Sequence, residues 1–400
     1  MIINKKALII LYPLKIKKFD LERWEINFLK KKLYLEIHSF HNLLNRDLIN
    51  AHKSQISKNK IIYNFDSINL WKTRVKFLKN KYPKIFFLNL LMKDKFYKII
   101  IFLILKKLRL SRIDVAIRGL PLLVDKISYF KIFLNKIINI TSKRKIKWFV
   151  VSCKIKIIDF FINILKLEAN FLLVAGKQNF LAKKKNLISK LVIEDFSSQD
   201  RSRFLRNQHC KKIIKGNYCV YLGELGPYDP GDHLYINEKN HLDHRYYDRL
   251  NFFFDDFEKI NNTKIVVAVH PKALAKRDSK YLGNRLAFYN KSNELIKHCK
   301  FVICSLTVSI SYALLHKKPI LFIYDNTFNN TSRLQLNLLN SLIGGKIINT
   351  ENYKKNEIFV KTDSINLNKY NKFIKHYISQ RNDNKTNYQI ILDLVKQYGK

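Results

Sequence analysis

Glycine, proline and cysteine are all scarce in this chain. Its 400 residues include 10 Gly and 7 Pro, about 4% together against a usual ~12%. Such a chain is not collagen-like, not of low complexity and not an all-β protein with many turns. The five cysteines are odd in number and contain no Cys-x-x-Cys pair. We therefore expect neither disulfides nor a structural zinc site.

Long apolar runs are also missing. The longest run near the middle of the chain, Ile99 to Leu105, is far shorter than the roughly 20 residues that a membrane-spanning helix needs. Near the start, Lys5 and Lys6 precede a short apolar run, but no small-residue cleavage site follows. The sequence therefore predicts no signal peptide and a cytoplasmic location.

Acidic residues are few, and the net charge is +44, from 75 Lys and Arg against 31 Asp and Glu. Lys, Asn, Ile, Phe and Tyr, the residue types that AT-rich codons specify, crowd the sequence, so codon bias explains much of this excess. Residues 1–200 carry 42 basic and 14 acidic residues, and residues 201–400 carry 33 and 17. Charge this dispersed is not typical of nucleic-acid binding. It favours a peripheral contact of the more basic first half with anionic lipid on the inner face of the plasma membrane.

Apolar runs of strand length alternate with helical patterns along the whole chain, which is typical of parallel, doubly wound sheets. The first helix is expected from Asp20, as its N-cap, to Lys32, and the polar segment 197–216 is expected to join two domains. The predicted strands are Lys6–Tyr12, Leu33–His38, Lys84–Leu90, Ile113–Ile117, Trp148–Ser152, Phe171–Ala175, Leu191–Ile193, Tyr218–Leu222, Lys264–Val269, Phe301–Cys304 and Pro319–Tyr324.

Polar residues follow the strands of the second half, where an open parallel sheet collects its ligands. Ser305, Thr307 and Ser309 bring hydroxyls and backbone amides to the start of a helix, which favours a phosphate. An ordinary Ser/Thr helix cap is the alternative. His270 and Pro271 end another strand, which we expect to be adjacent. A histidine there can donate to a phosphate oxygen or protonate a leaving group, or it can simply bond a neighbouring carbonyl.

Two charged residues complete the candidate donor site. Arg285 could add positive charge beside a diphosphate, or it could be a solvated surface cation. Glu224 could bind a ribose or sugar hydroxyl, or it could be an ordinary loop residue. The sequence contains no Asp-x-Asp pair and no GxxxxGK[ST], GxGxxG or GxSxG motif. These absences argue against a metal-dependent nucleotide-sugar site, an NTPase, a dehydrogenase and an α/β-hydrolase. We expect no metal and no cofactor.

Five short runs in residues 218–325 resemble the C-terminal domain of GT-B-fold enzymes of bacterial surface-polysaccharide synthesis, which include sialyltransferase-like and capsule glycosyltransferases. The runs are VVAVHP (266–271), ELIKHC (294–299), FVICS (301–305), SISYAL (309–314) and KPILFI (318–323). In the bacterial sialyltransferases a His-Pro motif and a Ser/Thr pair contact the phosphate of the nucleotide-sugar. The resemblance implies this role for His270-Pro271 and for Ser305 with Thr307.

The resemblance also implies an α/β protein with two Rossmann-like, doubly wound domains that face a cleft. Residues 1–205 would form the acceptor-side domain, residues 206–380 the nucleotide-sugar-binding domain, and residues 381–400 a helix that packs across both. The acidic Asp/Glu-Asp/Glu-Gly motif that supplies the base in those sialyltransferases is absent from residues 1–205. The base is therefore unassigned, and we expect it across the cleft, near Pro13 to Asp20 or near Arg118-Gly119.

The expected function is metal-independent transfer of a sugar from a nucleotide-sugar donor to a surface-polysaccharide or lipid-linked glycan acceptor. An anionic membrane surface is a further expected partner. Two alternatives stay open. One is a nucleotide-sugar epimerase or a glycerophosphotransferase on the same fold. The other is a non-catalytic protein that binds anionic membranes or nucleic acid.

Overall fold

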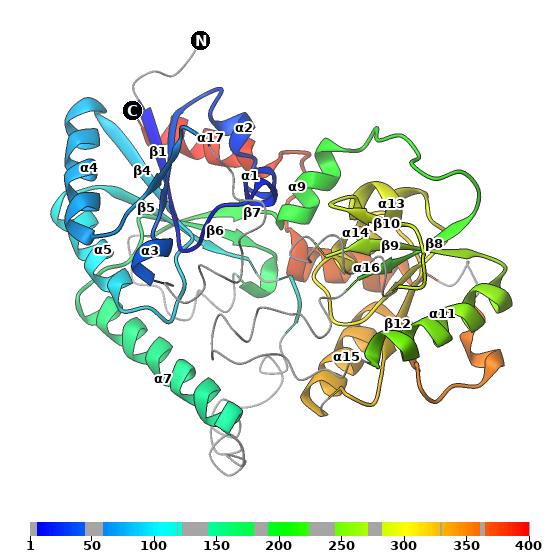
Figure 1. Cartoon of the computed structure of the whole chain (residues 1–400). Coiled ribbons are helices and arrows are strands. Elements are labelled where there is room, and N and C mark those ends of the chain that lie inside the picture. Colours follow the sequence, from blue (N-terminus) through cyan, green and yellow to red (C-terminus); the bar gives the residue numbers. More distant parts are fainter. Residues whose placement is uncertain are drawn as a thin grey trace.

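Two parallel β-sheets with helices on both faces make up the protein (Figure 1). The computed structural model describes residues 6–44, 59–117, 119–121, 143–179, 191–223, 245–270, 282–328, 330–360 and 365–399. The expected fold class, with two Rossmann-like, doubly wound domains, is confirmed by the strand order of both sheets.

The first sheet has seven strands in the order β3-β2-β1-β4-β5-β6-β7, and all of its neighbouring strands are parallel. Its helices divide between the two faces: α1, α2 and the C-terminal α17 pack on one, whereas α4 and α5 pack on the other. The strands are β1 Lys6–Tyr12, β2 Tyr34–Ser39, β3 Ile62–Asn64, β4 Lys84–Asn89, β5 Ser111–Ala116, β6 Phe171–Ala175 and β7 Val192–Phe196. The helices are α1 Lys18–Arg23, α2 Ile26–Leu29, α3 His41–Leu44, α4 Ile68–Lys81, α5 Tyr97–Lys107, α7 Lys143–Ile164 and α17 Asn387–Gln397.

Two expectations for the first domain are wrong. The helix expected from Asp20 to Lys32 is broken at Glu25, whose φ of 55° lies in the left-handed region. Lys17 precedes α1, and its backbone amide donates to Asp20 Oδ2 at 3.0 Å, so Asp20 lies inside the first turn and is not the N-cap. The strand expected at residues 148–152 lies inside α7.

The second sheet has six strands in the order β10-β9-β8-β11-β12-β13, again all parallel. Apolar residues of α11 are buried against it, as the helical spacing predicts. The strands are β8 Tyr218–Leu222, β9 Lys264–Val269, β10 Ala287–Tyr289, β11 Val302–Cys304, β12 Ile320–Tyr324 and β13 Lys346–Asn349. The helices are α11 Tyr246–Asn261, α13 Ser292–His298, α14 Ile310–Leu315, α15 Asn330–Ile343 and α16 Leu367–Phe373.

The chain crosses between the domains twice, and the two crossings lie side by side. After β7 it enters α9 (Gln199–Arg206), which contacts α13 and α14 of the second domain. It returns through residues 379–386 to α17, which buries Ile391 and Val395 in the core cluster of the first domain. An antiparallel bridge between Ser197 and Ser379 links the two crossings.

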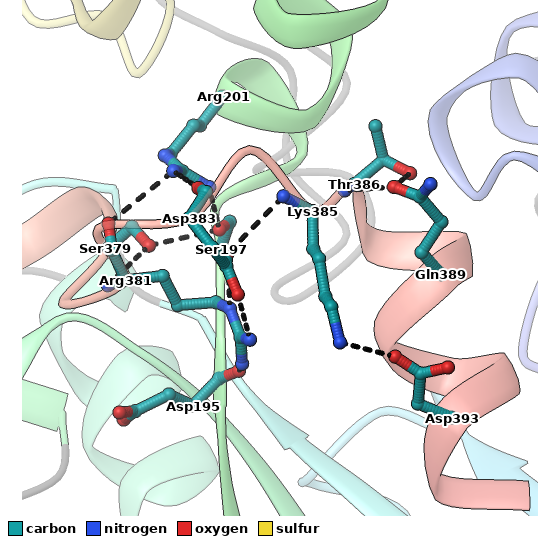
Figure 2. A network of polar contacts seen from close by, with 10 residues as sticks. All are labelled: Asp195, Ser197, Arg201, Ser379, Arg381, Asp383, Lys385, Thr386, Gln389 and Asp393. Carbon is teal, nitrogen blue, oxygen red and sulfur yellow. Dashed lines mark hydrogen bonds and ion pairs between the residues drawn. The ribbon is translucent and has the colours of Figure 1, made fainter.

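A polar network holds these crossing segments together (Figure 2). Arg201 donates to Ser197 Oγ at 2.9 Å and to the carbonyl oxygen of Asp383 at 2.5 Å. Arg381 forms an ion pair with Asp383 and donates to the carbonyl oxygen of Asp195 at 2.8 Å. The pairing with Arg381 lowers the pKa of Asp383 to about 2. Contacts from both crossings thus fix the connection between the domains.

Candidate active site

The carboxyl ends of the two sheets meet through two glycines. A Cβ on Gly119, which follows β5, would lie 2.2 Å from Val308 Cγ1, which follows β11. A Cβ on Gly176, which follows β6 and has a φ of +79°, would lie 2.5 Å from the carbonyl oxygen of His376, which follows α16. At Gly176 the neighbouring atoms are backbone, so only glycine fits there, whereas at Gly119 the neighbour is the Val308 side chain. The ligand-collecting edges of both sheets therefore border one region of the molecule.

A pocket opens at the carboxyl edge of the second sheet. Strands β8 and β12, the turns after β11, β12 and β13, and helix α11 supply its walls. The lining residues are Tyr221, Tyr246, Leu250, Ser305, Ile323, Tyr324, Asp325, Phe328 and Thr350. Its walls are mostly apolar and aromatic, but its cavity volume is only about 10 Å³, far below the roughly 300–1,000 Å³ of a small-molecule site, so a larger ligand could contact only its rim.

The charged groups beside this pocket are paired within the protein. Asp325 is buried, and its Oδ1 accepts from the backbone amide of Thr327 at 3.0 Å. Its Oδ2 lies 3.5 Å from Arg249 Nη2, and Arg249 Nε lies 2.9 Å from Glu351 Oε1. The second oxygen of Glu351 accepts from Asn326 Nδ2 at 2.8 Å. This wall of the pocket is thus held in place without a ligand.

The predicted phosphate turn also bonds to itself. The amide of Leu306 donates to Ser305 Oγ at 2.6 Å, and the amide of Thr307 donates to the Ser305 carbonyl oxygen at 3.1 Å. The amide of Ser309 donates to Thr307 Oγ1 at 3.3 Å. A phosphate would have to replace these bonds, and the helix behind it has only six residues. Ser305 nevertheless lines the pocket, so its contact with a donor stays a prediction.

The other predicted donor residues are dispersed. The strands that precede His270 and Ser305 are not neighbours, because β8 lies between β9 and β11; two strand spacings correspond to about 10 Å. Arg285 lies at the amino end of β10, where it pairs with Asp255 at 2.5 Å and with Glu258 at 2.8 Å. It is therefore not at the pocket's edge of the sheet. Glu224 and Pro271 lie outside the described residues.

The first sheet carries a second polar group of residues at its own carboxyl edge. His41 follows β2, and Asp94 and Tyr97 follow β4; these strands flank β1. The rings of Phe40 and Tyr97 stack with centroids 6.4 Å apart, which brings the two segments together. His41 Nε2, Asp94 Oδ1 and the Tyr97 hydroxyl are all buried and have no hydrogen-bond partner.

The protonation of these groups suits a ligand with hydroxyl groups. Burial, followed by the charge of Lys15, lowers the pKa of His41, so its imidazole is neutral at pH 7 and one nitrogen is a proton acceptor. Burial and the nearby Asp94 raise the pKa of Tyr97, so its hydroxyl remains a donor. A buried polar atom without a partner costs about 1–3 kcal/mol, and a ligand that bonds to it removes this cost.

Sequence reasoning missed these three residues, although a signal was available. Ligands collect where parallel strands end, and this holds for the strands of the first half as well. Phe40-His41 after β2 and Asp94 after β4 are the residues to which this signal leads. Within the described part of the chain, no three His, Cys, Asp or Glu side chains are grouped so that they could hold a metal ion.

No protein-family model and no curated protein matches the chain. Its structure is similar to that of Phytolacca americana UGT2 complexed with UDP-2fluoro-glucose and pterostilbene, with a TM-score of 0.51, 8% identity and 100% of both chains covered. It is also similar to CalG4, the calicheamicin glycosyltransferase, with a TM-score of 0.50, 10% identity, and 99% of this chain and 98% of the other covered. The UDP-GlcNAc 2-epimerase from Methanocaldococcus jannaschii has a TM-score of 0.49 and 14% identity, with 98% of this chain and 99% of the other covered. The first two similarities confirm the GT-B fold over the whole chain.

Proposed function

We propose that this protein is a glycosyltransferase that moves a sugar from a nucleotide-sugar to a hydroxyl group of a glycan or a lipid-linked glycan. The observation that carries the proposal is the pairing of two sheet edges: one holds a pocket, and the other holds three buried polar atoms without partners. The GT-B fold and the UDP-sugar bound to one structural neighbour support a nucleotide-sugar as donor.

The donor would lie against the rim of the pocket of the second domain. The partly exposed rings of Tyr324 and Phe328 offer flat apolar surface for a nucleobase, and the buried Tyr221 and Tyr246 support them from behind. Ser305 lines the same pocket, and His270 follows a strand two positions away in the sheet. Both would contact the diphosphate and stabilise the negative charge that develops as the sugar departs.

The acceptor would occupy the edge of the first sheet. A neutral His41 can take the proton of the attacking hydroxyl at Nε2, which is the role of a general base. Asp94 Oδ1 can accept a hydrogen bond from a neighbouring hydroxyl, and Tyr97 can donate one. Bonds of this kind would orient the acceptor toward the anomeric carbon.

Binding and turnover with UDP-, GDP-, CMP- and CDP-linked sugars test the proposal. We expect one class to bind and its nucleotide to be released only when a glycan acceptor is present. Replacing His270 or Ser305 with Ala should raise the donor KM about tenfold, equivalent to about 1.4 kcal/mol of binding. The matched control is His209→Ala, because His209 is an exposed histidine beyond α9.

The products of the same assay separate the rival functions. A changed sugar on an intact nucleotide-sugar, formed without acceptor, would identify an epimerase. Binding of none of the four nucleotide-sugar classes would contradict the proposal.

A further inference from the structure

Helix α7 has two apolar faces, and only one of them is covered. The inner face buries Val151 and Ile158, and Ile162 packs against the core cluster that contains α4 and α5. A surface helix of a globular protein normally has a single apolar stripe toward the core and polar residues opposite. The residues opposite this core-facing stripe are therefore expected to be polar.

The outer face of α7 carries a second apolar stripe. It consists of Ile146, Val150, Ile157, Phe160 and Ile164, all of them exposed. Steps of four, seven, three and four residues keep them on one side of a helix that turns every 3.6 residues. Phe160 and Ile164 are the most open, with 58% and 59% of their surface accessible. The stripe runs along the whole 22-residue helix.

Lysines border this stripe on both sides. At about 100° per residue, Lys154 and Lys147 fall some 80–100° to one side of it, and Lys156 falls about 80° to the other. All three are exposed. Lysine can lay its aliphatic stem along an apolar surface while its ammonium reaches the headgroup layer. An apolar stripe between rows of lysine is the pattern of a helix that lies in the interface of an anionic bilayer.

The two neighbouring helices extend the same surface. Among the described residues, 20 large apolar side chains are exposed, and 12 of them lie on or directly beside α4, α5 and α7. By sequence, these helices hold five, three and six basic residues and a single acidic residue, Asp159. Figure 1 shows α4 and α5 on the side of the first sheet that points away from the second domain, and α7 running obliquely downward from beside α5. We call this surface the α4–α5–α7 face.

We propose that the α4–α5–α7 face binds an anionic lipid bilayer, with α7 lying parallel to the membrane plane. In the described ranges, no helix has the length and apolar character needed to cross a bilayer, which agrees with binding at the surface. A second copy of this chain suits the face less well, since two such faces would bring their lysines together. The proposal goes beyond glycosyl transfer, and it can be tested without any activity.

Co-sedimentation of the full chain with vesicles tests it. We expect binding to vesicles of phosphatidylcholine with about 30% phosphatidylglycerol, at least tenfold weaker binding to pure phosphatidylcholine, and weaker binding at high salt. The variant Val150→Glu/Ile157→Glu/Phe160→Glu should bind the anionic vesicles at least tenfold less. The matched control is Phe252→Glu/Leu334→Glu, which changes exposed apolar residues of the second domain and should bind like the unmodified chain.

A charge variant keeps the test decisive if the triple variant folds poorly. Lys147→Glu/Lys154→Glu/Lys156→Glu leaves the apolar stripe intact and should also lose at least tenfold in binding. Equal binding by the unmodified chain and a folded variant would overturn the proposal, as would failure to bind anionic vesicles. A dimer in solution that dissociates in the triple variant, without vesicle binding, would overturn it in favour of a second copy as the partner.

Discussion

The two sheet edges that meet in this protein differ in how their buried polar atoms are satisfied. At the second edge, the carboxylates of Asp325 and Glu351 pair with Arg249, and the turn after β11 bonds to its own side chains. At the first edge, His41 Nε2 and Asp94 Oδ1 have no hydrogen-bond partner. Asp325 Oδ2 and Arg249 Nε at the second edge also lack a hydrogen bond, but ion pairs hold them. The second edge is thus held together by ion pairs, whereas the first offers buried polar atoms to a ligand.

Two buried histidines three residues apart sharpen this contrast. His38 Nδ1 accepts from Trp71 Nε1 at 3.0 Å, and its Nε2 lies 2.8 Å from Glu36 Oε2. Both of its nitrogens are therefore used, and its role is structural. His41 leaves Nε2 unused although it is just as inaccessible. The same short segment satisfies both ring nitrogens of one buried histidine and leaves Nε2 of the other without a partner, which supports the proposed role of His41 as the general base.

The largest expected effect comes from replacing each of these two histidines with alanine. His41→Ala should lower kcat of sugar transfer by about 10²–10⁴, because it removes the general base. Donor binding and the unfolding midpoint should change little, since His41 Nε2 makes no hydrogen bond within the protein. His38→Ala should instead destabilise the fold by about 1–3 kcal/mol, because it leaves the buried Trp71 indole N–H without its acceptor. Glu36 loses one partner but keeps Arg74 and Tyr34.

Kinetics, donor titration and urea unfolding of the two variants measure this difference. Asp94→Asn should resemble His41→Ala, with Asp248→Asn as an exposed control on α11. Full kcat in His41→Ala would contradict the assignment of the base.

A smaller effect is expected where the two edges touch. Gly119→Leu would push against Val308 and separate the edges, and we expect kcat to fall about tenfold with little change in donor binding. Val308→Gly should restore much of the rate in the double variant, because it makes room for the new side chain. A double-mutant cycle on kcat measures the coupling. Additive effects of the two changes would show that this contact does not set the spacing.

Much of the fold could be predicted from the sequence because its central strands are continuous apolar runs. The bounds expected for β1, β8 and β9 match the structure at both ends. The segment 148–152 misled because α7 is apolar on two faces, so any short stretch of it reads as a buried strand. The break at Glu25 has no local signal, since neither Gly nor Pro marks it.

The site was harder to predict than the fold, because it depends on strand order. Sequence order suggested that His270 and Ser305 are on neighbouring strands, but the sheet inserts β8 between them. Arg285 was assigned from its charge alone, and its pairing with Asp255 and Glu258 is a tertiary contact. The lack of a hydrogen bond at His41 Nε2 and Asp94 Oδ1 is likewise visible only once the chain is folded.

The smallest effect concerns the acid stability of the second domain. Burial, helped by Lys318, lowers the pKa of His316 at the end of α14 to about 4, and its Nε2 lies 2.9 Å from Asn293 Oδ1. The side chain of an unfolded histidine has a pKa near 6.5. Between pH 6.5 and 4 the unfolded chain therefore binds a proton at this residue that the folded chain does not bind. This contribution to stability is complete above pH 6.5 and is lost as the pH falls toward 4.

The loss should amount to about 2 kcal/mol, after allowance for the partial exposure of the ring. Urea midpoints at pH 7.5 and 4.5 measure this loss. His316→Gln should lose less stability between these pH values than the unmodified chain. The control His209→Gln should lose as much as the unmodified chain. His38, whose pKa is also lowered by burial, adds the same sign of pH dependence in the first domain, so the informative quantity is the difference between variants. Equal losses in His316→Gln and the unmodified chain would mean that protonation of His316, at the end of α14, does not contribute to the acid sensitivity of the second domain.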